Sequence, residues 1–139
     1  MVFIELDFGR KRKIVEKAKL ELLHNHQTLK TILITNTRVI YDSNSVAANI
    51  AAIVSHQGNR VALIDADFKR PLLHELFNVP NRVGLMDILH GERSLRSLLH
   101  SVTSNHIFLL TTGINSNGKT DPFASPYLFD FASIRYFFP

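Results

Sequence analysis

The sequence predicts an α/β domain in which helices flank a parallel sheet. Two apolar runs, residues 61–67 (VALIDAD) and 107–110 (IFLL), show no alternation of polar and apolar side chains. This pattern is typical of strands that are buried on both faces of a parallel sheet. A similar run at 31–35 (TILIT) is separated from 61–67 by a stretch of helical composition at 43–57. The order strand, helix, strand indicates a β-α-β unit.

Composition favours one globular domain. The chain has 139 residues, of which 45% are hydrophobic and 20% charged, enough to bury a core. It contains no cysteine, which excludes a disulfide framework and a thiolate metal site. The cytoplasm is therefore the expected location.

Two segments are expected along the chain. Residues 14–25 (IVEKAKLELLHN) have the spacing of an amphipathic helix, and we assign 1–30 to an N-terminal helical arm. Residues 31–139 form the α/β domain. Its helix at 43–57 is rich in alanine, and Gly58 stands where a left-handed C-terminal cap belongs.

The second half of the domain is expected to hold two short helical pieces and a last strand. The pieces are residues 84–90 and 95–100, separated by Gly91. The strand at 107–110 follows, and the apolar run ends at Gly113. Residues 126–138 (PYLFDFASIRYFF) are apolar on every side, so they would have to pack against other residues.

The block from 61 to 91 carries the chemistry. Asp65 and Asp67 follow the strand at 61–64, and a basic pair with a proline (Lys69, Arg70, Pro71) comes next. The runs LLHELF and PN-x-x-GL-x-x-IL-x-G complete the block. It resembles the conserved block of the bacterial tyrosine kinases of capsule and exopolysaccharide synthesis, within the wider MinD and ParA group of P-loop ATPases.

The resemblance implies a P-loop NTPase-like sheet, here incomplete with three recognisable strands, that uses ATP and Mg²⁺. By resemblance, Asp65 and Asp67 would be the catalytic carboxylates and the Mg²⁺ ligands. Carboxylate oxygens at the carboxyl end of a buried parallel strand suit that metal. The alternative for a lone D-x-D is a solvated turn or a helix N-cap.

The expected phosphate loop departs from the family pattern. Aligned without gaps, the family's glycines fall on Ile40 and Asp42, and its phosphate-binding lysine falls on Ser43. A phosphate cradle needs glycines for close backbone approach and a cation for the phosphate oxygens. We therefore expect a degenerate loop, with Ser43, Asn44 and Ser45 at the cofactor-binding positions. Asp42 or Ser43 would instead cap the helix.

A second stretch satisfies the written phosphate-loop pattern. Gly113, Gly118, Lys119 and Thr120 match G-x-x-x-x-G-K-[ST] after an apolar run. Such a loop must open directly onto a helix, and Pro126 would fall inside that helix. We interpret the match as coincidental, and these four residues stay as weak cofactor-binding candidates.

The resemblance covers residues 31–138. The family continues into a strand with a second catalytic aspartate and a tyrosine-rich segment, so we expect a truncated member. Glu16 and Lys19 resemble the family's oligomerisation helix, whereas Leu22 departs from it. The match at Glu16 and Lys19 makes a homo-oligomer one of the expected partnerships.

Three functions remain open. The first is a degenerate, non-catalytic domain that docks on a membrane adaptor of a polysaccharide export system or on a kinase homologue, which would bring it to the membrane. The second is an active ATP-dependent tyrosine kinase domain, and the third is a non-functional gene remnant. Nucleic-acid binding is not expected, because it rests only on basic residues near the start. The seven histidines form no metal site at readable spacing.

Overall fold

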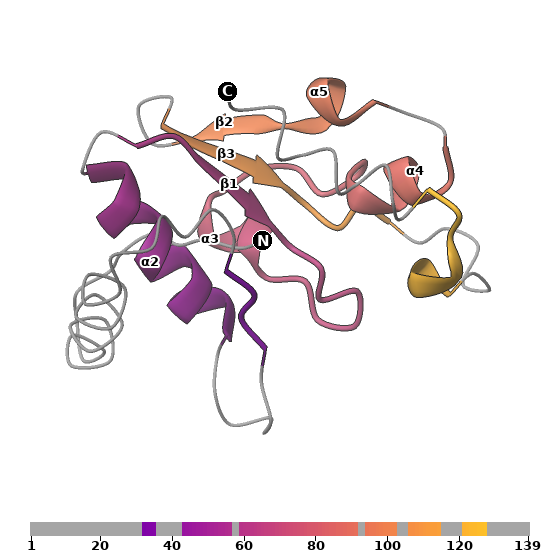
Figure 1. Cartoon of the computed structure of the whole chain (residues 1–139), viewed down its shortest axis with the longest axis horizontal. Helices are drawn as coiled ribbons and strands as arrows, with labels where there is room; N and C mark the ends of the chain where they lie inside the picture. The colour runs from indigo at the N-terminus through magenta and orange to yellow at the C-terminus, as the bar shows by residue number, and fades with distance from the viewer. Residues whose placement is uncertain are drawn as a thin grey trace.

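A computed structural model describes residues 32–35, 43–56, 59–91, 94–102, 106–114 and 121–127. Figure 1 shows its elements along the chain. They are α2 (Ser43–His56), β1 (Val61–Ile64), α3 (Leu73–Leu76), α4 (Leu85–Leu89), α5 (Leu95–Leu98), β2 (His100–Val102), β3 (Ile107–Leu110) and the 3-10 turn η1 (Pro122–Ala124).

The sheet has three strands in the order β1-β3-β2. β1 pairs in parallel with β3, with Val61 opposite Ile107 and Ile64 opposite Leu110. β2 runs antiparallel to β3 at the other edge. The predicted α/β class and the buried parallel pair are confirmed, and β2 adds an antiparallel edge strand.

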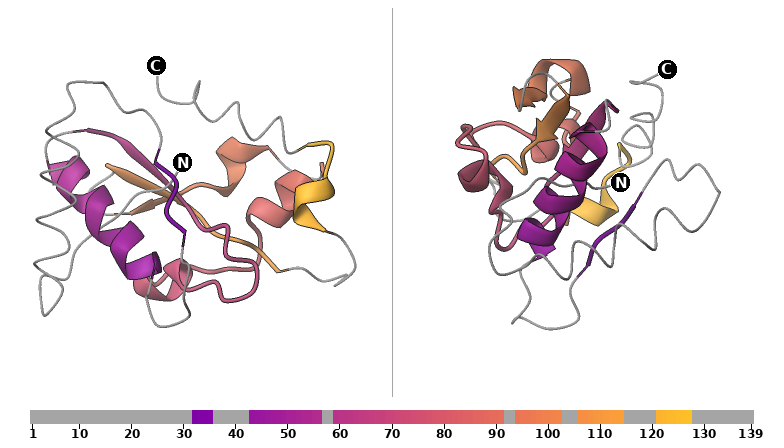
Figure 2. Two further views of the ribbon diagram at one scale, coloured as in Figure 1. Left: turned by 60° about the horizontal axis from the view of Figure 1, so that its bottom comes forward. Right: turned by 90° about the vertical axis from the view of Figure 1, so that its left-hand side faces the viewer.

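Helices cover both faces of the sheet, which explains why its strands are apolar without alternation. On one face, Leu63 and Leu109 pack with the alanines of α2 and with Leu73 of α3. On the other face, Ile64 and Leu110 pack with α4 and α5. Figure 2 shows α2 along one side of the strands.

The first predicted strand is not present as a strand. Residues 32–35 have no regular secondary structure in the part of the segment that is described. Ile32 and Ile34 pack against the core, whereas Leu33 is 77% exposed. The segment therefore buries only one side, and an apolar run alone could not distinguish it from a strand buried on both faces.

Other element boundaries also differ from the expectation. The run at 61–67 is a strand only as far as Ile64, because the carboxylate of Asp65 accepts the N–H of Asp67 and turns the chain. The expected helix at 95–100 ends at Leu98, and His100 begins β2. A strand of three residues is too short for periodicity to reveal.

Several sequence expectations lie outside the described residues. They are the N-terminal arm at 1–30, the loop positions Ile40 and Asp42, the cap at Gly58, and the motif residues Gly118, Lys119 and Thr120. Among the described residues, no helix is long and apolar enough to span a membrane.

Candidate functional site at the carboxyl ends of β1 and β3

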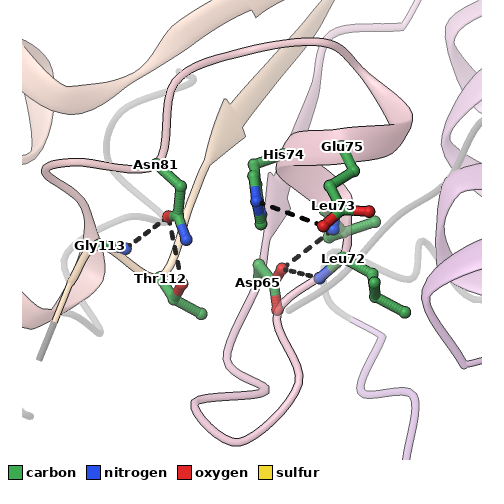
Figure 3. Close-up of polar contacts among 8 residues, drawn as sticks. All are labelled: Asp65, Leu72, Leu73, His74, Glu75, Asn81, Thr112 and Gly113. Atoms are coloured by element: carbon green, nitrogen blue, oxygen red, sulfur yellow. Dashed lines mark hydrogen bonds and ion pairs between the residues drawn. The ribbon is translucent and has the colours of Figure 1, made fainter.

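Asp65 is the most deeply buried ionisable group at the end of β1. Its side chain is buried, with a relative exposure of 1% for the residue. Oδ1 accepts the N–H of Asp67 at 3.1 Å. Oδ2 accepts the N–H groups of Leu72 at 3.2 Å and Leu73 at 3.1 Å (Figure 3). One carboxylate thus fixes both ends of the loop between β1 and α3.

Burial raises the pKa of the Asp65 carboxyl above its ordinary value. The three N–H groups oppose that rise, since they stabilise the charged form, and the nearby negative charge of Asp67 adds to it. The loss of hydration is the larger effect. Burial thus disfavours the charged form of Asp65, and the three backbone N–H groups offset part of that cost.

Asp67 organises the next turn. Its Oδ1 accepts the N–H groups of Lys69 at 3.2 Å and Arg70 at 3.0 Å, an arrangement typical of aspartate in turns. Within the described part of the chain, Oδ2 of Asp67 accepts no hydrogen bond. Of the two carboxylate oxygens of Asp67, Oδ2 is therefore the more available to a cation.

A second polar cluster lies at the end of β3. The Oδ1 atom of Asn81 accepts the hydroxyl of Thr112 at 3.2 Å and the N–H of Gly113 at 2.8 Å. Thr111 donates its hydroxyl to the carbonyl of Val83 at 3.0 Å. These bonds join the segment before α4 to the strand end, beside the loop that Asp65 holds (Figure 3).

The start of α4 is built against the same strand end. The N–H groups of Leu85 and Met86 donate to the carbonyls of Thr111 at 2.8 Å and Thr112 at 2.9 Å, so the first helical N–H groups are satisfied. Asp87 Oδ2 accepts the N–H of Gly84 at 2.6 Å, as the third residue of a capping box does. These residues belong to the block at 61–91, but the sequence pattern did not predict a role for them.

Asn81 should contribute measurably to stability through this cluster. We expect Asn81→Ala to lower the free energy of unfolding by about 1 to 2 kcal/mol, because the partly buried N–H of Gly113 loses its acceptor. Asn81→Asp, which keeps an oxygen there, should cost less. Urea denaturation followed by circular dichroism measures both. Equal losses for the two variants would contradict the role of the oxygen.

His74 projects from α3 over the same edge (Figure 3). Its Nε2 atom lies 3.9 Å from Oε1 of Glu75, and its buried Nδ1 atom has no hydrogen-bond partner. Among the described residues there is no group of three His, Cys, Asp or Glu side chains that could hold a metal ion. A cation at this edge would depend on carboxylates and on a bound ligand.

The remaining predicted site residues are placed as follows. Ser43, Asn44 and Ser45 form the first turn of α2, where the Ser45 carbonyl accepts the side-chain amide of Asn49 at 2.6 Å. Gly113 belongs to the Asn81 cluster, and its φ of +74° is favoured by glycine. The structure brings Asp65, Asp67 and Gly113 to one sheet edge, since the carboxyl ends of parallel strands meet there.

The fold is similar to that of solved bacterial tyrosine kinase domains. The kinase domain of the Escherichia coli tyrosine kinase ETK superposes with a TM-score of 0.79 at 19% identity, covering 91% of this chain and 51% of that one. The sequence agrees with the fold. Over 97 residues the chain is 30% identical to the tyrosine-protein kinase YwqD of Bacillus subtilis, covering 70% of this chain and 41% of that protein. It is 32% identical over 81 residues to the putative tyrosine-protein kinase EpsB of Ralstonia nicotianae, covering 58% and 11%.

The predicted resemblance is thus confirmed: the chain is a homologue of bacterial tyrosine-protein kinases. It spans about two fifths of the length of the first of these relatives and about a tenth of the second. No protein-family model matches the chain.

Proposed function

We propose that this chain is a tyrosine-kinase-like domain of capsule or exopolysaccharide synthesis that does not catalyse phosphoryl transfer and acts by docking on partner proteins. The observation that carries the proposal is the set of hydrogen bonds that the Asp65 carboxylate accepts. All three of its hydrogen bonds come from backbone N–H groups of its own loop, and Oδ2 accepts two of them. A carboxylate oxygen has about two acceptor positions, so Oδ2 is saturated by the chain itself.

The sequence supports the same proposal at the phosphate loop. Ile40, Asp42 and Ser43 stand where glycines and a lysine are expected. Asp42 would bring a negative charge toward the phosphates, and like charges at close range repel. Ser43 is the first residue of α2. We infer that ATP and Mg²⁺, the cofactors expected from kinase relatives, bind weakly or not at all.

An active ATP-dependent kinase is the second candidate, and two carboxylate oxygens with an open acceptor position favour it. Oδ2 of Asp67 and the remaining acceptor position on Oδ1 of Asp65 could still contact Mg²⁺ held by a nucleotide. Asp65 and Asp67 would then be the metal ligands and the catalytic carboxylates. Phosphorylation of tyrosine in the chain itself or in a tyrosine-containing polymer would decide for this candidate.

Restoring the phosphate loop should restore nucleotide binding. We expect the double variant Asp42→Gly, Ser43→Lys to bind Mg-ATP more tightly than the unmodified chain by roughly tenfold or more, because it removes one repulsive charge and adds one attractive charge. Isothermal titration calorimetry measures the change. The variant Asp42→Asn, Ser43→Ala is the control, since it removes the charge without adding a cation.

The loop proposal fails if the double variant and its control bind Mg-ATP equally. In that case something other than this loop determines nucleotide affinity.

On this proposal the chain lies in the cytoplasm and reaches the membrane by binding a partner. The partner would be a membrane adaptor of a polysaccharide export system or a kinase homologue. The chain could also bind further copies of itself as a homo-oligomer. Co-purification of the chain with the adaptor of its own polysaccharide system tests this. We expect capture without added ATP; capture that requires ATP would contradict a nucleotide-independent role.

A further inference from the structure

Four exposed side chains, two basic and two apolar, lie on α3 and in the turn just before it. We call Lys69, Arg70, Leu72 and Leu76 the α3 surface. Lys69 and Arg70 are exposed, and Leu72 and Leu76 are 39% and 53% exposed. The N–H of Leu76 donates to the carbonyl of Leu72 at 3.1 Å, which puts the two leucines one helical turn apart on the same side.

Hydrogen bonds to the carboxylates of Asp65 and Asp67 fix the backbone of this surface. Asp67 accepts the N–H groups of Lys69 and Arg70, and Asp65 accepts that of Leu72. Leu73, between the two exposed leucines, is fully buried in the core. A loop that is fixed before binding loses little conformational entropy when a partner arrives. The carboxylates of Asp65 and Asp67 thus fix the backbone that carries Lys69, Arg70 and Leu72.

The two cations of the α3 surface are not paired with each other or with other described residues. In the portion of the chain that the structure describes, neither Lys69 nor Arg70 forms an ion pair. Glu75 lies between the two leucines in sequence, and its side chain is 68% exposed. The surface thus offers two cations without an ion pair among the described residues, two apolar side chains and one carboxylate within eight residues of chain, 69–76.

We propose that the α3 surface docks an acidic amphipathic segment of a partner protein. Carboxylates of that segment pair with Lys69 and Arg70, and its apolar side chains cover Leu72 and Leu76. The proposal deepens the docking function and rests on it. Charge complementarity selects the occupant, because an acidic segment satisfies both cations and removes the leucines from water.

The exposed carboxylate of Glu75 argues against two other occupants. An anionic lipid surface or a nucleic acid would place phosphates next to it, and like charges oppose that contact. Two cations are also few for phosphate-driven binding, which gains strength with each neutralised phosphate. A protein segment with a basic residue opposite Glu75 meets neither obstacle.

The test is a fluorescence-anisotropy titration of the full chain with labelled synthetic helices. One helix has glutamates and leucines at i, i+3 and i+4 spacing and one lysine to face Glu75; a second replaces its glutamates by lysines, and a third replaces its leucines by serines. We expect saturable binding of the first helix only. Arg70→Glu should weaken it by about tenfold, since a lost ion pair and a new repulsion together approach 1.4 kcal/mol.

Matched variants control for general effects of charge and polarity. Arg82→Glu changes another exposed arginine and should alter binding by less than about twofold. Leu76→Ser should weaken binding, whereas Leu33→Ser, at a more exposed leucine, should not. All four side chains are exposed, so circular dichroism should show that each variant folds.

Three results would overturn the inference. The first is no saturable binding of the acidic helix, and the second is equal weakening by Arg70→Glu and Arg82→Glu. The third is that the chain binds vesicles of anionic phospholipid instead of the helix and that Arg70→Glu abolishes this vesicle binding. Capture of the adaptor distinguishes failure of the α3-surface inference from failure of the proposed docking function. If the adaptor is captured equally by the unmodified chain and by Arg70→Glu, docking stands and occurs elsewhere on the chain.

Discussion

Gly84→Ala should be among the most destabilising single substitutions in the described part of the chain. A Cβ atom at Gly84 would lie 2.2 Å from the carbonyl oxygen of Thr111 and 2.5 Å from the nitrogen of Gly113. Both are backbone atoms at the end of β3, so no side chain can move aside. The φ of Gly84 is extended, and close approach alone excludes a larger residue.

The expected loss is about 3 kcal/mol or more in the free energy of unfolding, because overpacking adds to the loss of two backbone hydrogen bonds. Those bonds run from Leu85 and Met86 to the strand end. Urea denaturation measures the loss. For a domain of marginal stability this is a large fraction of the total.

Gly91→Ala is the matched control. Its Cβ would meet the ring of Tyr127 at 2.8 Å, and Gly91 has a φ of +74°. The ring is the far end of a side chain that is partly exposed and can turn away. We therefore expect a loss of about 1 kcal/mol, mainly from the left-handed backbone. Equal losses at the two glycines would contradict the explanation by contact with fixed backbone.

Asp65→Ala should have an effect of similar size. It leaves the buried N–H of Leu73 and the partly buried N–H groups of Asp67 and Leu72 without their acceptor. Each unpaired buried donor costs about 1 to 3 kcal/mol, so the expected loss is about 3 to 5 kcal/mol after partial relaxation. Thermal and urea unfolding measure it. Asp67→Ala is the control, with an expected loss of about 1 kcal/mol because water can replace its two exposed hydrogen bonds.

The pH dependence of stability gives a second measure of Asp65. Because burial raises the pKa of this carboxyl in the folded chain, the folded state holds more protons than the unfolded state between the two pKa values. The stability of the unmodified chain relative to Asp65→Asn should therefore increase as the pH falls through the raised pKa, and level off below the ordinary value near 3.8. A relative decrease over this range would contradict a raised pKa.

The sequence predicted those parts of the fold in which local pattern and burial agree. The strand at Ile107–Leu110 and the helix at Ser43–His56 were found close to their predicted bounds. The segment 32–35 was misassigned because an apolar run does not tell whether one side or both sides meet the core. β2 was missed because it pairs through its backbone over only three residues.

The site was predicted in part for similar reasons. Asp65 and Asp67 could be found because they follow a buried strand directly. Their hydrogen bonds to residues 67–73 could not be foreseen, since the same carboxylates would serve a metal or a turn. The cluster of Asn81, Thr112 and Gly113 joins residues about thirty positions apart, a separation that a local pattern does not reveal.

A thermal-shift titration of the unmodified chain with Mg-ATP tests the central claim most directly. A ligand that binds only the folded state must raise its stability, by about 2.7 kcal/mol at a hundred times its dissociation constant. We predict no increase in the unfolding temperature at millimolar Mg-ATP, with the Asp42→Gly, Ser43→Lys variant as the responsive comparison. A saturable increase for the unmodified chain would contradict the claim that this domain works without nucleotide.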